Sequence, residues 1–151
     1  IYQIRELQNG GEFVVLLFLA AWGNDTLAYC TGMLIGKHKM SPILSPKKSI
    51  EGLVGGIVGA AILGALYGLY LNTYIRFSFN PVTMFPIVCG LGGAVSVIGD
   101  LAASAIKRDS GIKDYGTLIP GHGGILDRFD SIIFIAPVIY YLTVMISGGA
   151  I

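Results

Sequence analysis

Apolar residues fall along this chain in four long runs, which short polar segments separate. The runs are Phe13–Ile35, Gly52–Leu71, Met84–Ile106 and Ile132–Ile146. A helix needs about 20 mostly apolar residues to cross the hydrocarbon core of a bilayer, and only the fourth run is short of that length. We expect the fourth helix to extend back into the preceding loop. The pattern predicts an all-α, polytopic membrane helix bundle of about four transmembrane helices, with residues 1–151 as one membrane-embedded catalytic domain.

The composition favours a membrane protein over a soluble one. Hydrophobic residues make up 54% of the chain and charged residues 13%, which is about half the charged share of an ordinary soluble domain. The net charge of +1 gives no reason to expect a nucleic-acid partner. Cys30 and Cys89 each stand alone in an apolar run, so neither a disulfide framework nor a metal knuckle is indicated.

Basic residues gather in two of the connecting loops. Loop 36–51 and loop 107–131 hold Lys37, Lys39, Lys47, Lys48, Lys107, Arg108, Lys113 and Arg128. Two helices separate these loops, so both should lie on one side of the membrane. The positive-inside rule makes that side the cytoplasm. We therefore expect an integral, multi-pass membrane protein with two basic cytoplasmic loops.

Glycines in the second run predict a closely packed helix face. They form three GxxxG spacings, at Gly52/Gly56, Gly55/Gly59 and Gly64/Gly68. Glycine at every fourth position lets two helix backbones approach, so this face should pack against another helix. A second copy of the chain could supply that helix as a homodimer. Membrane helices are also generally rich in glycine, which is the simpler explanation.

Two aspartates lie inside apolar runs, Asp25 in the first and Asp100 in the third. Burying an ionisable group at the centre of a membrane helix costs at least about 2.5 kcal/mol, so such a residue is a candidate functional position. Polar residues near Asp100 recur at helical spacing and would form a stripe toward the cytoplasmic end. They are Ser96, Ser104, Lys107 and Arg108. Neutralisation of Asp100 by Lys107 would explain this stripe, but not the segment that follows it.

That segment combines a glycine-rich turn with paired carboxylates. It reads KRDSGIKDYGTLIPGHGGILDRFD from Lys107 to Asp130. Its proline and glycines allow a sharp turn whose backbone amides can face an anion. Asp127 and Asp130 would share one face at a helix start, where carboxylate oxygens suit a hard cation. With Asp100 they predict a site for Mg²⁺ and polyphosphate, in which His122 carries a proton, donates phosphate or only shapes the turn.

The same residues resemble the C-terminal signature of the phosphatidate cytidylyltransferases, or CDP-diacylglycerol synthases. The matching positions are Ser104, Lys107, Arg108, Lys113, Asp114, Gly116, Pro120, Gly121, His122, Gly123, Gly124, Asp127, Arg128 and Asp130. Segments 22–29, 36–39 and 45–52 are similar to earlier blocks of the family, with Ser49 where Thr is expected. Family members are longer and have additional N-terminal membrane helices. Because the chain also opens at Ile1 inside an amphipathic stretch, we expect it to be the later part of a longer protein.

The resemblance implies transfer of the CMP moiety of CTP to phosphatidic acid, which gives CDP-diacylglycerol and pyrophosphate. It places Asp100, Asp127 and Asp130 at a metal centre with Mg²⁺ and, in at least one relative, K⁺ as a second ion. Catalytic candidates are Asp100, Lys107, Arg108, Asp127, Arg128 and Asp130. Substrate-binding candidates are Asp25, Lys37, Lys47, Lys48, Ser104, Lys113, Asp114, His122, Gly123 and Gly124. The expected partners are CTP, phosphatidic acid and the lipid bilayer, with the active site facing the cytoplasm.

Several alternatives explain part of the pattern. A CTP-dependent membrane lipid kinase would use the same nucleotide but transfer its γ-phosphate to a lipid alcohol. An ion-coupled transporter would line an ion path with Asp25 and Asp100, but it gives no reason for the glycine and histidine turn. Lys37, Lys47 and Lys48 could hold the triphosphate or the anionic headgroup, or could serve only as positive-inside anchors.

Overall fold

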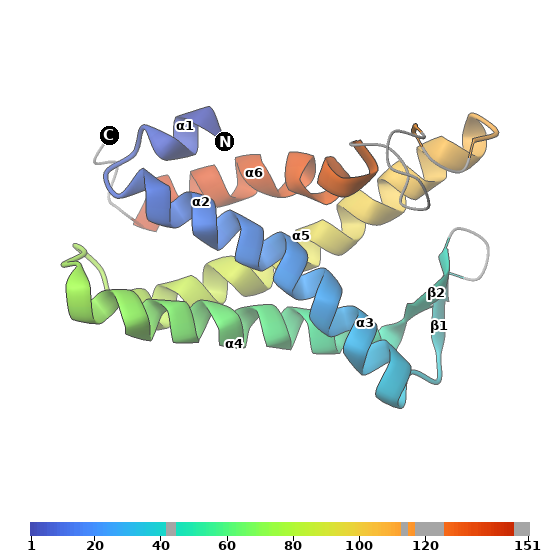
Figure 1. The fold of residues 1–151 in the computed structure, drawn as a ribbon, viewed down its shortest axis with the longest axis horizontal. Helices are drawn as coiled ribbons and strands as arrows, with labels where there is room; N and C mark the ends of the chain where they lie inside the picture. The colour runs from blue at the N-terminus through green and yellow to red at the C-terminus, as the bar shows by residue number, and fades with distance from the viewer. Residues whose placement is uncertain (42–44, 113–114, 117–125, 147–151) are drawn as a thin grey trace.

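A computed structural model describes residues 1–41, 45–112, 115–116 and 126–146 of the chain. The elements are, in order, α1 (Tyr2–Arg5), α2 (Gly10–Phe18), the π-helix η1 (Leu19–Gly23), α3 (Asn24–Ile35), β1 (Lys39–Ser41), β2 (Ser45–Ser49), α4 (Ile50–Tyr74), α5 (Pro81–Asp109) and α6 (Leu126–Ile146). Helix α5 packs against both α4 and α6, and the continuous segment α2–η1–α3 crosses the bundle diagonally (Figure 1).

Four helical segments are long and apolar enough to cross a membrane. They are Gly10–Ile35, Ile50–Tyr74, Pro81–Asp109 and Phe129–Ile146. The predicted all-α membrane bundle is therefore confirmed as the architecture of the described residues. The expected backward extension of the fourth helix is also confirmed, because α6 begins at Leu126.

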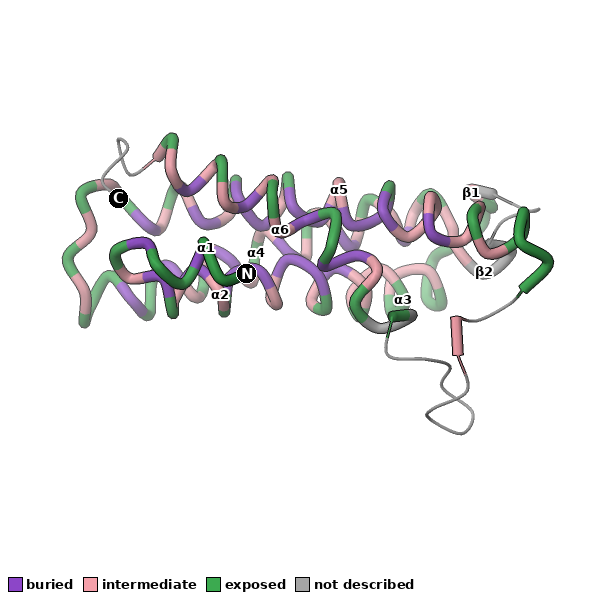
Figure 2. Tube along the Cα trace, turned by 90° about the horizontal axis from the view of Figure 1, so that it is seen from above, coloured by how far each residue is buried: buried purple, intermediate pink, exposed green. Residues whose placement is uncertain are grey.

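Helix α4 buries its small residues and exposes its large ones, the reverse of a helix in a soluble protein. Its buried face is made of Gly52, Gly56, Ala60, Gly64, Gly68 and Leu71. Its exposed side chains include Val54, Val58, Ile62, Leu66 and Leu69. Figure 2 shows the same division along the bundle, with exposed residues outside and buried residues between the helices. Such an apolar exterior suits contact with lipid.

The glycine face of α4 packs against other helices of the same chain, which confirms the predicted close approach. A Cβ at Gly64 would lie 2.7 Å from the carbonyl oxygen of Phe85 on α5. A Cβ at Gly56 would lie 2.7 Å from Oδ1 of Asn24 on α3. These glycines are therefore required for packing within the chain. The homodimer stays a prediction.

The first basic loop contains a β-hairpin that the sequence pattern did not predict. β1 pairs antiparallel with β2, and Lys39 lies opposite Ser49. Ser49 also caps the next helix, since its Oγ accepts a hydrogen bond from the Gly52 amide at 3.1 Å. The hairpin lies at the same end of the bundle as the C-terminal end of α5, and the α4–α5 connection lies at the other end (Figure 1). Both basic segments thus share one end, as predicted.

Candidate functional site

Three aspartates of the predicted site come together from three different helices. Asp25 lies in the first turn of α3, Asp100 near the end of α5 and Asp130 near the start of α6. Asp25 and Asp130 each lie close enough to Asp100 for its charge to repel theirs. Neighbouring carboxyl groups of this kind favour a proton or a cation between them. The fold thus gathers negative charge at one point.

The π-helix η1 ends immediately before Asn24 and Asp25. A π-helical turn holds more residues than an α-helical turn, and such turns occur often at functional sites. Asn24 is fully buried, and Gly93 of α5 comes close enough that a Cβ there would lie 3.0 Å from its Oδ1. This close approach brings α3 and α5 together where Asp25 and Asp100 lie. No feature of the sequence pattern indicated this irregular turn.

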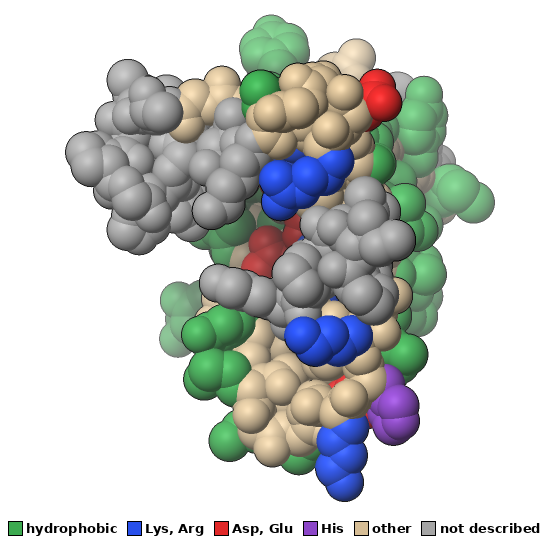
Figure 3. All heavy atoms as spheres, turned by 90° about the vertical axis from the view of Figure 1, so that its right-hand side faces the viewer, with side chains coloured by type: hydrophobic (Ala, Val, Ile, Leu, Met, Phe, Trp, Pro, Cys, Tyr) green, Lys and Arg blue, Asp and Glu red, His purple; other side chains and the backbone are tan. Residues whose placement is uncertain are grey.

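Two lysines accompany the aspartates. Nζ of Lys48 in β2 lies 2.7 Å from Oδ2 of Asp100, and Nζ of Lys107 in α5 lies 3.7 Å from Oδ2 of Asp130. Figure 3 shows acidic atoms recessed between basic side chains at this end of the molecule. Among the described residues, the cluster has three carboxyl groups but only two ammonium groups. This excess of negative charge favours the binding of a further cation.

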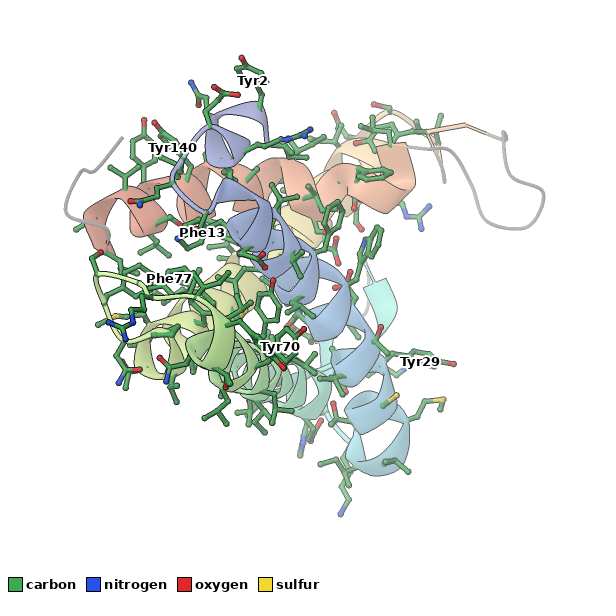
Figure 4. All side chains as sticks on the ribbon, turned by 60° about the vertical axis from the view of Figure 1, so that its left-hand side comes forward. Tyr2, Phe13, Tyr29, Tyr70, Phe77 and Tyr140 are labelled. Carbon is green, nitrogen blue, oxygen red and sulfur yellow. The ribbon has the colours of Figure 1, made fainter. Side chains whose placement is uncertain are left out.

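A cavity of about 670 Å³ opens beside Asp25 and Asp100, between α3, the hairpin, the start of α4 and α5. Its polar lining includes Asp25, Lys37, His38, Lys39, Lys48 and Asp100. Its apolar lining includes Tyr29, Met33, Leu53 and Val97, and Figure 4 shows Tyr29 on α3. The volume lies in the usual range for small-molecule sites. The lining suits a ligand that has both anionic and apolar parts.

Glu51, in the first turn of α4, binds the start of the hairpin through His38. Its Oε1 and Oε2 lie 3.3 and 3.2 Å from the backbone nitrogen of His38, whose N–H donates to them. Its Oε1 also lies 2.6 Å from Nδ1 of the same histidine. This contact holds the start of the hairpin, while Lys48 near its other end reaches Asp100. Sequence reasoning assigned no role to His38, Lys39 or Glu51.

The donor chemistry fits a hard cation, although the ligand set is incomplete in what the structure describes. Asp100 and Asp130 supply neighbouring carboxylate oxygens, the type of donor that Mg²⁺ prefers. Within the described ranges, no group of three His, Cys, Asp or Glu side chains is gathered closely enough to hold a metal ion. The backbone of Asp127 lies in the first turn of α6, but its side chain is outside the described part. The Mg²⁺ and K⁺ assignments stay predictions.

The remaining predicted site residues divide into two groups. Ser104 is half-buried and Arg108 exposed on α5, and Lys37 is exposed at the cavity. Outside the described residues lie Lys113, Asp114, His122, Gly123 and Gly124, together with the side chains of Lys47 and Arg128. The glycine and histidine turn is thus not part of the described site.

Comparison with known proteins gives one consistent family. The family model described as "Cytidylyltransferase family" matches residues 2–146. The chain is 38% identical to the phosphatidate cytidylyltransferase of Staphylococcus saprophyticus over 146 residues, which are 97% of this chain and 54% of that protein. It is 40% identical to the protein of the same name from Staphylococcus aureus over 143 residues, 95% of this chain and 52% of that protein. The chain spans about half the length of the curated relatives it matches.

Proposed function

The chain belongs to the cytidylyltransferase family, and we propose that the whole protein transfers the CMP moiety of CTP to phosphatidic acid. The products would be CDP-diacylglycerol and pyrophosphate. The observation that carries this proposal is the meeting of Asp25, Asp100 and Asp130 with Lys48 and Lys107 beside a cavity at one end of a membrane bundle. Curated relatives that are 38% and 40% identical to the chain carry the name phosphatidate cytidylyltransferase.

The reaction requires charge neutralisation more than proton transfer. A phosphate oxygen of phosphatidic acid attacks the α-phosphorus of CTP, and the bond from that phosphorus to the oxygen that bridges the α- and β-phosphates breaks. The electron pair leaves with pyrophosphate. Because the attacking oxygen is already anionic, no general base is needed. Mg²⁺ bound at the carboxylates would supply further positive charge at the phosphates.

The chain's own residues have separate parts in this proposal. Asp100, Asp127 and Asp130 hold the metal ion, while Lys107, Arg108 and Arg128 stabilise negative charge on the leaving pyrophosphate. Lys37 and Lys48 face the cavity, where their ammonium groups can bind substrate phosphate. Met33 and Leu53 line the same cavity, where they can contact an apolar part of the lipid substrate.

The position of the site suits one soluble and one membrane-bound substrate. The basic hairpin and the C-terminal end of α5 lie at the same end of the bundle. At a membrane surface, this end could receive CTP from water and a phospholipid from the bilayer. We expect this end on the cytoplasmic side, because its lysines and arginines follow the positive-inside rule.

Labelled CTP distinguishes this reaction from its nearest alternative. The full-length protein is incubated with Mg²⁺, phosphatidic acid and CTP labelled at either the α- or the γ-phosphate. Label from the α-phosphate should enter the lipid and label from the γ-phosphate should not. Entry of the γ-label, with a lipid alcohol as acceptor, would instead establish a lipid kinase. Ion flux in liposomes without CTP would favour a transporter.

A further inference from the structure

We infer that Lys48 is an exchangeable counter-ion of Asp100, which leaves Asp100 when a divalent cation binds and then binds a substrate phosphate. The inference rests on the proposed function in one respect, because it takes Asp100 as a metal ligand. Its direct support is the 2.7 Å contact between Lys48 Nζ and Asp100 Oδ2. The two residues are 52 positions apart, so the contact depends on where the hairpin lies against α5.

An ammonium group and a divalent cation compete for this carboxylate. Oδ2 of Asp100 already accepts the short charge-assisted hydrogen bond from Lys48. A metal ion bound to that oxygen would stand close to the ammonium, and two positive charges at such a distance repel strongly away from bulk water. The side chains of Lys48 and Asp100 are only 33% and 17% exposed, so solvent screens this repulsion incompletely. Metal binding should therefore displace Lys48.

After displacement, the ammonium group of Lys48 can bind a substrate phosphate in the cavity. Lys48 lines the same cavity as Lys37 and Lys39. Lysine carries a compact charge on a flexible four-carbon stem, so it can change partner without movement of the backbone. While Lys48 changes partner, the contact between His38 and Glu51 holds the start of the hairpin against α4. Lys48 can then neutralise Asp100 in the metal-free protein and a substrate phosphate in the protein that has bound metal and substrate.

Lys107 is held differently and is not expected to exchange. Its Nζ lies 3.7 Å from Asp130 and 5.1 Å from the centre of the Tyr115 ring, which adds a cation–π contact. Its side chain is 12% exposed, against 33% for Lys48. Lys107 is thus a fixed positive charge on α5, and Lys48 is the mobile one.

Metal affinity without nucleotide tests the exchange directly. The full-length protein in detergent is titrated with Mn²⁺, and free Mn²⁺ is measured by electron paramagnetic resonance. Lys48→Met should bind Mn²⁺ more tightly than the wild type, on the order of 10-fold, because a competing charge is removed. Lys39→Met, which removes a hairpin lysine that also lines the cavity, should change the affinity less than about twofold. Unchanged or weaker binding in Lys48→Met would overturn the inference.

Amine footprinting tests it in the unaltered protein. Acetylation of Lys48 and Lys39 is quantified by mass spectrometry without metal, with Mg²⁺, and with Mg²⁺ and CTP. Mg²⁺ alone should raise the labelling of Lys48 several-fold relative to Lys39, and CTP should lower it again. Labelling of Lys48 that does not respond to Mg²⁺ would contradict the exchange. Neither measurement requires turnover, so the two proposals can fail separately. If the metal titration and the labelling give the expected results but no CMP is transferred to lipid, the proposed reaction is wrong and the exchange of Lys48 is still supported.

Discussion

Nζ of Lys107 on α5 lies 3.7 Å from Oδ2 of Asp130 on α6, and both side chains are largely buried. The charge of Asp100 also acts on the Asp130 carboxyl group. Lys107→Met would leave the Asp130 carboxyl group without its ammonium partner, while Lys48 remains at Asp100. Because removal of one partner from a buried ion pair costs about 3–5 kcal/mol, we expect a lower free energy of unfolding and little turnover. Thermal unfolding in detergent and a CTP assay measure the two effects.

The double variant Lys107→Met/Asp130→Asn separates the two roles of this ion pair. Removal of both charges should recover most of the lost stability, since no buried charge is left alone. It should not recover turnover, since the proposal gives both Lys107 and Asp130 a part in the reaction. An unfolding temperature for Lys107→Met equal to that of the wild type would show that the ion pair does not stabilise the fold.

Asparagine substitutions test the carboxylates of the metal centre. Asp100→Asn and Asp127→Asn should each lower turnover on the order of 100-fold or more, since one charged ligand is lost from a preorganised site. Asp109→Asn is the matched control, because Asp109 is exposed at the end of α5. Turnover is measured across a Mg²⁺ titration, and unfolding is followed separately. Near-normal activity at limiting Mg²⁺ would remove the residue concerned from the centre.

Two glycines in adjacent helices distinguish tight packing from helix propensity. A Cβ at Gly64 would lie 2.7 Å from the Phe85 carbonyl oxygen and 2.9 Å from Sγ of Cys89, whereas a Cβ at Gly90 would meet only the Ala61 methyl group at 3.6 Å. Gly64→Ala should therefore destabilise the protein by about 1–3 kcal/mol. Gly90→Ala should have little effect. Equal unfolding temperatures in the two variants would refute the close α4–α5 contact.

The helices could be predicted from the sequence because membrane thickness fixes the length of an apolar run. Gly64 and its neighbours likewise predicted a packed face, since the spacing of small residues needs no knowledge of the partner helix. Asp100 was a candidate because it lies inside an apolar run, and Asp130 because it lies at an expected helix start. The length of an apolar run and the spacing of its small residues can both be read from one local stretch of sequence, so these features could be predicted.

The hairpin and its contacts could not be predicted in the same way. Segment 36–51 contains four lysines and two prolines, and its strands of three and five residues are too short for an extended alternation of apolar and polar residues. Lys48 meets Asp100 across 52 positions, and His38 meets Glu51 across 13. Such contacts depend on the relative placement of α3, α4 and α5. Residues that line the cavity, including Lys39, were therefore missed.

Membrane orientation can be tested with single cysteines at the two ends of the bundle. Ser110→Cys, just after α5, should react with an impermeant thiol reagent only from the cytoplasmic side. Asn72→Cys, near the end of α4, should react only from the opposite side. Cys30 is exposed and must first be replaced, whereas Cys89 is buried. Labelling of both positions from one side would contradict the proposed orientation and the membrane-spanning arrangement of α4 and α5.

The contact between Glu51 and His38 predicts an effect on substrate binding that a purely structural contact would not have. Glu51→Ala removes the acceptor of the His38 amide and the partner of its ring. The hairpin should then hold its lysines less firmly at the cavity. We expect the KM for CTP or phosphatidic acid to rise several-fold, with a smaller change in kcat, because binding contacts are lost before the transition state.

Ser49→Ala is the control for this last variant, because it weakens the same helix start without touching His38. It removes the hydrogen bond from the Gly52 amide, a helix cap whose loss costs about 1 kcal/mol. Glu51→Gln keeps an acceptor for the His38 amide and should restore part of the KM. If Ser49→Ala and Glu51→Ala reduce stability equally and leave KM unchanged, Glu51 only stabilises α4. If KM rises in Glu51→Ala alone, the contact positions the hairpin for substrate.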